Sequence, residues 1–350
     1  VYKRQAKNCT YIILLNWNGW KDTIACLESL FQSVEAQFRV VVCDNLSSDE
    51  SLSNIANWAR GVLPADVPDN QRLASLVEGA PRPIDYLACT SKDVDSGRVA
   101  DNGEPLILID NEQNLGFAGG NNVGLRFALS QHDMTHVWIL NNDTLVDPAC
   151  LSNMLARLEL EDGAGVCGSI IHFFDNPETI QAVGGNRFNR RTGVALQSEG
   201  RFRPEHELQD CASIEERIDY VSGCSMLIPR NVLERVGLLN EEYFLYYEEI
   251  DWFTRAGNSF SCCVAEDAHV YHREGGSIGS PRWSQSKPSL VADYHIFRSK
   301  HLFMRKYHPE SMLWCHLSSY VEVGKRLVRG QFQNAWVVLS VLLGMRSPRF

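Results

Sequence analysis

A set of polar residues that could hold a metal ion stands at residues 141–144, with the sequence Asn-Asn-Asp-Thr. It directly follows the apolar run Val-Trp-Ile-Leu at residues 137–140, a pattern typical of a buried strand that delivers polar groups to its carboxyl end. Ligands of open α/β sheets bind at that edge. One carboxylate among amides there indicates a metal site for a phosphate-bearing ligand. A turn that caps the next helix, which begins near Asp147, explains the same residues equally well.

Two further strand ends carry polar groups. Asn16 and Asn18 follow the apolar residues 10–15, and Asp44 follows the apolar residues 39–43. Adjacent ends of parallel strands converge on one crevice, so these groups are expected to lie near residues 141–144. Asp44 is suited to accept a hydrogen bond from the N–H of a nucleotide base. Its alternative role is to cap the following helix.

A glycine-rich segment, Asn-Leu-Gly-Phe-Ala-Gly-Gly-Asn-Asn at residues 114–122, stands before the third helix of the first half. Glycines allow a ligand to approach the backbone closely, and the amides of a helix N-terminus favour an anion. The spacing is not that of the G-x-G-x-x-G dinucleotide fingerprint. A glycine-rich helix cap without a ligand is the alternative.

The second half of the chain holds candidates for acid–base and metal chemistry. Three carboxylates, Glu248, Glu249 and Asp251, stand close together in a predicted helix, and one of them is a candidate general base. Acidic residues favoured by a helix N-terminus are the alternative. His272 ends a later strand, where a neutral imidazole could complete a metal shell begun by Asp143 or serve the fold alone.

The elements that must position these residues follow from the apolar pattern. In the first half, predicted strands alternate with predicted helices, which implies a parallel sheet with right-handed crossovers. The strands are predicted at residues 10–15, 39–43, 106–109 and 136–140, and the helices at 22–31, 47–60 and 119–130. Residues 61–105 have no clear period and are predicted to be an irregular insertion. The second half is predicted to contain a hairpin at 181–197, a strand pair at 218–229, a helix at 247–256, a strand at 268–272 and helices from 288 onward.

Composition limits the function classes. A net charge of −10 over 350 residues argues against a nucleic-acid partner. The 11 cysteines are scattered without a C-x-x-C pair, which favours reduced thiols in a cytoplasmic protein over a zinc or disulfide framework. No apolar stretch is long enough to span a bilayer. Residues 312–345 mix basic and large apolar side chains, which predicts packing on the catalytic core, a homodimer contact, or contact with a membrane surface.

Taken together and in order, these motifs resemble family 2 glycosyltransferases with the GT-A fold, and within them the rhamnosyltransferase branch. The resemblance covers residues 11–309 and rests on residues 114–122, 141–144, 244–256 and 272–277. It implies an α/β fold with a Rossmann-like, mostly parallel central sheet flanked by helices, followed by a C-terminal helical extension. The implied catalytic domain is residues 8–285, with a nucleotide-binding half at 8–145, an acceptor and catalytic half at 146–285, the insertion at 61–105, and a C-terminal helical region at 286–350.

The resemblance also implies residue roles. Asp143 and His272 are the implied metal ligands, and Glu249 is the implied base, with Asp251 as the fallback. The implied nucleotide and donor contacts are Asn16, Asn18, Asp44, Asn114, Gly116, Phe117 and Asn142. The implied candidates on the acceptor and phosphate side are Gly223, Trp252 and Arg255. Two positions depart from the family pattern: Asn141 replaces the first Asp of the D-x-D motif, and Glu249 replaces an Asp.

The implied activity is inverting transfer of a sugar with Mg²⁺ or Mn²⁺ as cofactor. The donor is expected to be dTDP-L-rhamnose, with UDP-linked sugars such as galactofuranose or N-acetylhexosamine as alternatives. The acceptor is expected to be a glycan or a lipid-linked glycan, at the cytoplasmic face of the inner membrane. The remaining alternatives are a non-catalytic module that binds a sugar nucleotide or glycan, and a nucleotidyltransferase.

Overall fold

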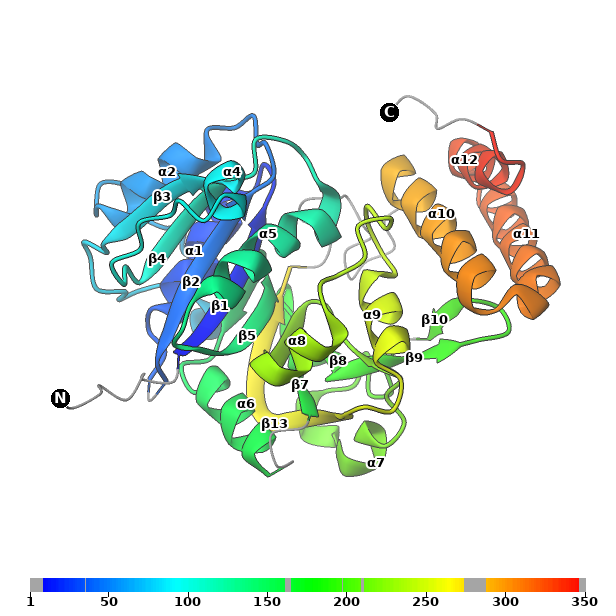
Figure 1. Ribbon diagram of the computed structural model, residues 1–350. Coiled ribbons are helices and arrows are strands. Elements are labelled where there is room, and N and C mark those ends of the chain that lie inside the picture. Colours follow the sequence, from blue (N-terminus) through cyan, green and yellow to red (C-terminus); the bar gives the residue numbers. More distant parts are fainter. Residues whose placement is uncertain are drawn as a thin grey trace.

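The computed structural model describes residues 9–34, 36–160, 165–196, 198–208, 211–273 and 288–345. Its core is one ten-stranded sheet in which strands β3, β4, β2, β1 and β5 pair in parallel, in that order. Figure 1 shows β1 to β4 in blue and cyan and β5 in green. The bounds of these strands are β1 (Cys9–Asn16), β2 (Phe38–Asp44), β3 (Tyr86–Thr90), β4 (Leu106–Asp110) and β5 (Met134–Asn141). The expected α/β fold with a mostly parallel sheet is therefore confirmed.

The sheet continues past β5 with mixed pairing. Strand β12 pairs with β5 and β7 in antiparallel orientation, and β13 pairs with β7 in parallel orientation. Strand β6 pairs with β13 and ends the strand order, whereas β8 pairs with β7 outside that order. A separate three-stranded sheet has the order β10-β9-β11. The bounds are β6 (Thr144–Val146), β7 (Gly165–Phe173), β8 (Asn176–Val183), β9 (Gly185–Asn189), β10 (Val194–Leu196), β11 (Tyr220–Val221), β12 (Ser225–Pro229) and β13 (Ser261–His272).

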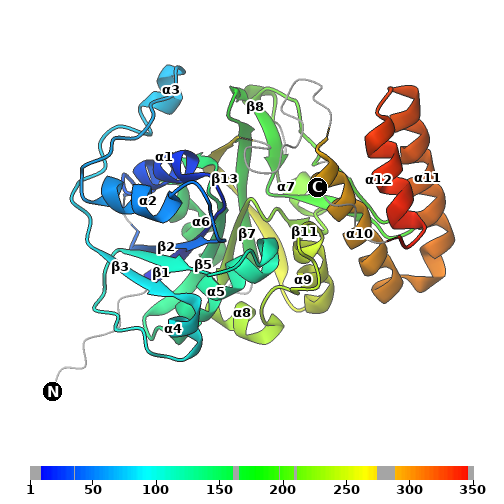
Figure 2. The same cartoon turned by 90° about the horizontal axis from the view of Figure 1, so that it is seen from above.

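The inner strands β1, β2, β4 and β5 are mainly apolar because helices cover both faces of the sheet. In β1, Ile12 and Leu14 pack under the helices of one face, whereas Tyr11 and Ile13 pack under those of the other. Figure 2 shows α1, α2 and α6 on one side, and α4, α5 and α8 on the other. The helix bounds here are α1 (Trp20–Leu30), α2 (Ser51–Ala59), α4 (Ser91–Asp95), α5 (Gly116–Ser130), α6 (Cys150–Glu159) and α8 (Arg230–Val236).

The prediction that residues 61–105 form an irregular insertion is wrong in one respect. It contains β3, which pairs with β4 as the edge strand of the sheet, as well as α3 (Gln71–Ala74) and α4. The strand residues are intermediate or exposed rather than buried. An edge strand with half-exposed side chains has no strong apolar pattern, which is why its periodicity is weak in the sequence.

Several boundaries differ from the predicted ones. Helix α5 begins at Gly116 and not at residue 119, so residues 116–122, which are most of the glycine-rich segment, are helical. Helix α2 begins at Ser51, with Glu50 and not the serines at 47 and 48 in the capping position. Strand β13 begins at Ser261 and not at residue 268. The prediction missed its first half because charged, exposed residues separate the two halves, at the point where the pairing with β7 shifts register.

The C-terminal region is helical, as expected. Helices α10 (Leu290–Tyr307), α11 (Met312–Val328) and α12 (Phe332–Leu342) contact one another and form a bundle beside α9 (Glu248–Ala256), shown in orange and red in Figure 1. Within the described residues, no helix combines the length and the apolar character needed to cross a bilayer. The predicted domain boundary at 285/286 and residues 274–277 of the last resembling motif lie outside the described residues.

Candidate active site

The two predicted metal ligands lie side by side at the carboxyl edge of the sheet. Asp143 follows β5, and His272 is the last residue of β13, which pairs with β6 next to Asp143. The Asp143 Oδ1 and His272 Nε2 atoms are 3.3 Å apart. The amide nitrogen of Asn141 lies 3.2 Å from the same Nε2 atom. Asn141 therefore stands beside the pair as a hydrogen-bonding neighbour.

The imidazole of His272 is held in a defined orientation. Its Nδ1 atom lies 3.0 Å from the Oε1 atom of Gln181, so Nδ1–H donates to the amide oxygen and Nε2 is the ring nitrogen that faces Asp143. Burial disfavours a charged imidazole, but Cys224 and Asp143 favour it and hold the pKa of His272 well above its ordinary value. The position thus attracts positive charge. A carboxylate oxygen and an imidazole nitrogen at this spacing fit a Mg²⁺ or Mn²⁺ ion.

The ends of β1 and β2 form one hydrogen-bonded unit. The Asn16 amide donates to Asp44 Oδ1 over 2.6 Å, and the backbone N–H of Ser47 donates to Asp44 Oδ2 over 2.9 Å. The Asn18 carbonyl side chain in turn accepts the backbone N–H of Ser48 at 2.7 Å. Asp44 therefore orders the turn after β2 and does not cap α2. Asn16 is fully buried, which makes it a support for Asp44.

Asn142 points into the protein. It is 7% exposed, and its amide donates to the hydroxyl of Thr23 on α1 over 2.9 Å. The Thr23 hydroxyl donates to Asn16 over 2.8 Å. The structure thus connects Asn142 to the strand-end unit beneath the crevice and does not place it as a direct donor contact.

The start of α5 is joined to two distant segments. Asn45, which follows β2, donates to the backbone oxygen of Gly116 over 2.9 Å and lies 3.3 Å from Asn114. The backbone N–H of Phe117 donates to the oxygen of Phe244 over 2.7 Å. A Cβ atom on Gly116 would lie 2.2 Å from that oxygen. Gly116 is therefore required for backbone packing, and Phe244 and not a ligand occupies the space beside it.

The candidate base, Glu249, lies in the first turn of α9 against a sharp turn. A Cβ atom on Gly223 would lie 3.9 Å from the Glu249 carboxyl carbon and 4.0 Å from the ring of Phe117. The next residue, Cys224, accepts the backbone N–H of Asn141 over 2.9 Å. The turn at Gly223 and Cys224 therefore connects the carboxylate of Glu249 with the end of β5, where Asp143 lies.

Electrostatics separate the two adjacent glutamates. Burial, reinforced by the charge of Glu249, raises the pKa of Glu248 well above its ordinary value, and burial also raises the pKa of Glu249. Glu248 is 5% exposed, whereas Glu249 is only partly buried. Like charges that are close together cannot both ionise easily, and the more buried Glu248 has the larger rise in pKa. Glu249 is therefore the easier of the two to ionise. Just before them, Tyr246 and Tyr247 have φ values of 65° and 73°, a strained conformation for these residues.

Asp251, Trp252 and Arg255 do not reach the site. Asp251 is fully buried, and it accepts hydrogen bonds from Arg255 over 2.8 Å and from Tyr307 over 2.9 Å. Burial would raise the pKa of Asp251, but the donors around it outweigh burial and lower it. Trp252 is fully buried and donates to the oxygen of Gly237 over 2.7 Å. All three residues hold α9 in place, which argues against Asp251 as the base and against an acceptor contact by the other two.

The residues that sequence reasoning missed are the ones that support the site. Asn45 could have been found, because it directly follows the strand that ends at Asp44. Gln181 and Cys224 carry no sequence signal, since each is a single polar residue within an ordinary strand or turn, and only the fold brings them to His272.

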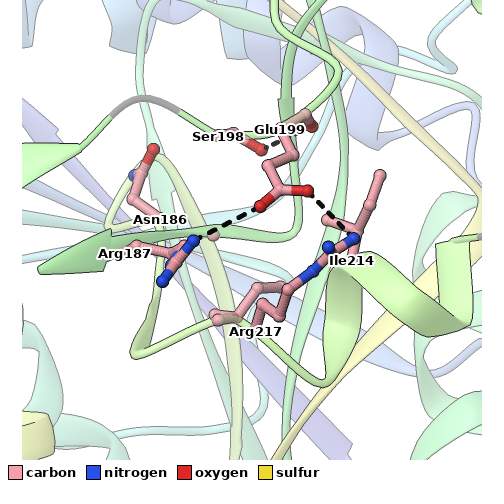
Figure 3. A pocket seen from close by; sticks show the side chains of 8 residues that line it. Asn186, Arg187, Ser198, Glu199, Ile214 and Arg217 are labelled. Atoms are coloured by element: carbon pink, nitrogen blue, oxygen red, sulfur yellow. Dashed lines mark hydrogen bonds and ion pairs between the residues drawn. The ribbon is translucent and has the colours of Figure 1, made fainter.

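A small pocket elsewhere contains none of the predicted site residues. It is lined by Gly185, Asn186, Arg187, Ser198, Glu199, Ile214, Arg217 and Ile218. In Figure 3 the carboxylate of Glu199 joins Arg187 and Arg217, at 3.5 and 2.9 Å. Paired charges of this kind explain the pocket as a surface ion-pair network near α7 (Cys211–Glu215).

Comparison with known proteins finds a matching family model and a curated relative. The model of the family Glycosyl transferase family 2 matches residues 96–237, a stretch that runs from before β4 through α8 and includes Asp143. This stretch of the chain is therefore similar to glycosyl transferase family 2. A curated relative, the low-salt glycan biosynthesis hexosyltransferase Agl10 of Haloferax volcanii, is 24% identical over 233 residues, which are 65% of this chain. The match covers 66% of that relative, just under two thirds of its length.

A solved structure with a similar architecture shows the fold. The structure of GalNAc-T7 with UDP, GalNAc and Mn²⁺ matches 84% of this chain and 48% of its own, with a TM-score of 0.50 and 12% identity. Residues 1–349 of S. aureus TarS match 84% of this chain and 64% of that structure, with a TM-score of 0.43 and 14% identity. The mixed α/β architecture described above is that of the GT-A fold.

Proposed function

We propose that this chain is a metal-dependent glycosyltransferase that uses a nucleoside diphosphate sugar as donor and inverts the anomeric centre. The observation that carries the proposal is the approach of Asp143 and His272 to 3.3 Å at the carboxyl edge of a GT-A sheet. The strand-end carboxylate of Asp44 and the partly buried Glu249 border the same edge through the turns described above. The glycosyl transferase family 2 match over residues 96–237 supports the same reaction class.

The residues divide the work as follows. Asp143 and His272 would hold Mg²⁺ or Mn²⁺, and the bound ion would neutralise charge on the diphosphate leaving group. Asp44, oriented by Asn16, accepts a hydrogen bond from the pyrimidine N–H. Glu249 takes the proton of the acceptor hydroxyl, and the adjacent Glu248 stays protonated. With one base and a displaced diphosphate, the displacement is direct and no covalent enzyme intermediate is needed.

The first donor that we propose is dTDP-L-rhamnose, on the resemblance of the ordered motifs. UDP-linked sugars are the alternative, because uracil and thymine present the same N–H and carbonyl edge to Asp44. The hexosyltransferase activity named for the Haloferax volcanii relative supports a hexose donor. A glycan or lipid-linked glycan remains the proposed acceptor, with no nucleic-acid partner.

We propose that the C-terminal helices provide a partner surface, because they expose several large apolar side chains. Exposed side chains on α11, α12 and the segments beside them include Leu313, Trp314, Leu317, Tyr320, Val321, Val328, Phe332 and Trp336. The predicted peripheral membrane contact and the predicted homodimer both fall on this surface. Both stay predictions, as do the cytoplasmic location and the domain bounds.

The proposal is tested with a panel of sugar nucleotides in the presence of Mn²⁺. The cognate donor should raise the melting temperature with increasing concentration and release nucleoside diphosphate when acceptor or water attacks it. The Asp143→Asn variant should lose metal-dependent donor binding, whereas Asp69→Asn, at an exposed aspartate, should retain it.

Three outcomes contradict the proposal. Binding without release of nucleoside diphosphate under every metal condition would indicate a non-catalytic module. Release of pyrophosphate from a nucleoside triphosphate and a sugar phosphate would indicate a nucleotidyltransferase. Unchanged Mn²⁺-dependent turnover in Asp143→Asn would remove the assignment of the metal-binding edge.

A further inference from the structure

A second group of metal-ligating side chains lies on the face of the sheet opposite His272. In the pairing of β7 with β13, His172 is opposite Tyr271, and His272 is opposite Phe173. Side chains alternate between the two faces along a strand, so His172 and Tyr271 share one face and His272 faces the other way. His269, two residues before Tyr271, lies on the face of His172. The two groups of ligands are therefore separate.

The geometry of this group suits a single ion. The His172 Nε2 and His269 Nδ1 atoms are 3.0 Å apart, and the His269 Nδ1 and Glu205 Oε1 atoms are 3.6 Å apart. One ligand atom from each of the three residues lies within 4.8 Å of the others. A tetrahedral ion with bonds of about 2.0–2.1 Å places neighbouring ligands about 3.3–3.4 Å apart, so only small side-chain movements are needed.

His172 Nε2 and His269 Nδ1 share a hydrogen bond, and a bound ion would replace the proton between them. His172 is fully buried, and burial, together with the charges of His269 and Arg72, lowers its pKa to about 3, so the imidazole is neutral. The other oxygen of Glu205 lies 3.7 Å from the Arg72 guanidinium, which orients the carboxylate and leaves Oε1 toward His269. The carboxylate of Asp147 also interacts electrostatically with His269 and with Arg72.

We propose that His172, His269 and Glu205 bind one divalent ion of the zinc class, with the fourth tetrahedral position open to water. Two imidazoles and one carboxylate form a donor set that Zn²⁺ favours, in contrast to the oxygen-rich setting that suits the Asp143 edge. The ion fastens the short helix η1 (Glu205–Glu207) to β7 and β13. It thereby restrains β13 three residues before His272. Its role is to stabilise this end of the sheet and not to contact the sugar donor.

The experiment titrates Zn²⁺ alone into chelator-stripped, full-length protein that carries Asp143→Asn and His272→Gln, so that the first metal-binding edge is disabled. Calorimetry should show one Zn²⁺ bound per chain, and thermal unfolding should show a rise in the melting temperature. Adding His269→Gln should weaken Zn²⁺ binding by more than about 100-fold, since even changes to outer-shell partners of metal ligands cost about 10–100-fold. The matched control, His132→Gln, removes an exposed histidine elsewhere and should leave binding intact.

Glu205→Gln covers the case in which loss of a strand histidine prevents folding, because Glu205 lies on a surface segment and Gln preserves its size. It should weaken Zn²⁺ binding and abolish the visible absorption of bound Co²⁺ that is expected of a four-coordinate site. If the variant lacking Asp143 and His272 binds no Zn²⁺, or if Glu205→Gln and His269→Gln bind it as tightly as their parent, the three residues are a hydrogen-bonded cluster and the proposal is overturned.

Discussion

At the scale of single residues, two carboxylates that are neighbours in sequence have different surroundings. Glu249 is partly buried and lies beside Gly223 and Phe117, whereas Glu248 is buried; the Oε2 atom of each carboxylate lacks a hydrogen-bond donor among the described residues. A general base must be ionised and must reach the acceptor. Glu249 is the proposed base, and the structure argues against Asp251 because cations and Tyr307 already occupy its carboxylate.

The first prediction concerns the base. Glu249→Gln removes the proton acceptor but keeps the shape of the side chain, so donor binding should be unchanged while transfer falls by about 10²–10⁴-fold. Calorimetric donor binding and single-turnover transfer measure the two effects separately. The comparison variant is Asp251→Asn, assayed at a temperature at which circular dichroism shows it folded. If Asp251→Asn loses transfer while Glu249→Gln keeps it, the base is Asp251.

The second prediction concerns pH and stability. Because the pKa of Glu248 is raised in the folded protein, the folded state binds more protons than the unfolded chain from about pH 4.3 upward. The free energy of unfolding should therefore fall as the pH rises through this window, and Glu248→Gln should reduce that fall. Urea unfolding at several pH values tests this against Glu216→Gln, at an exposed glutamate. Parallel pH profiles for wild type and Glu248→Gln would contradict the prediction.

At the scale of elements, helix α5 carries its glycines for packing. A Cβ atom on Gly120 would lie 2.4 Å from Leu15 and 2.9 Å from the Asn45 side chain, and one on Gly124 would lie 2.7 Å from Ile13. The missing side chains let α5 approach β1 closely. This close approach lets Asn45 reach the start of the helix. The packing of α5 against β1 therefore positions residues 114–117.

The third prediction compares two glycine-to-alanine changes. Gly120→Ala should destabilise the protein by about 1–3 kcal/mol through overpacking and should weaken nucleotide binding by displacing Asn45. Gly324→Ala, in α11 with open space around the position, should instead stabilise by about 0.5–1 kcal/mol and leave binding unchanged. Denaturant unfolding and donor titration distinguish the two variants. A tolerated Gly120→Ala would show that α5 can move away from β1 without cost.

At the scale of the whole molecule, the C-terminal bundle of α10, α11 and α12 is attached to α9, the helix that carries the proposed base Glu249. Lys306 and Tyr307 of α10 donate to Asp251 of α9 over 3.1 and 2.9 Å, and Ser299 donates to the oxygen of Leu245 over 2.9 Å. These contacts connect the bundle to the segment that carries Glu249. The bundle therefore helps to hold the strained backbone at Tyr246 and Tyr247.

The fourth prediction tests this anchor. Asp251→Ala leaves Arg255 and Lys306 without their carboxylate and should destabilise the protein by about 2–4 kcal/mol, because removing one partner from a buried charge group is costly. The lowered pKa of Asp251 means that its contribution is present above about pH 3.9 and is lost as the pH falls through the still lower folded value. Lys306→Gln should cost less, since Lys306 is partly exposed and the other donors remain. Equal stability of Asp251→Ala and wild type at pH 7 would contradict the anchor.

Much of the fold was predictable from local patterns. The apolar runs that end at Asn16, Asp44 and Asn141 predicted three strands at about their observed positions, because strands buried on both faces leave a strong signal. The edge strand β3 was missed, because its half-exposed side chains leave only a weak apolar pattern in the sequence. The role of Gly116 was also misjudged, because the sequence does not show that Phe244 fills the space beside it.

The sequence by itself determined which residue types stand at the ends of the strands, because apolar runs that end in polar residues are a local property of the chain. Only the tertiary structure decided which of these groups meet. Asp143 and His272 come together through strand pairing far along the chain, and Asn142 and Asp251 turn inward to structural partners. Orientation and burial depend on packing between distant segments, and those contacts separate the residues that face the crevice from those that support it.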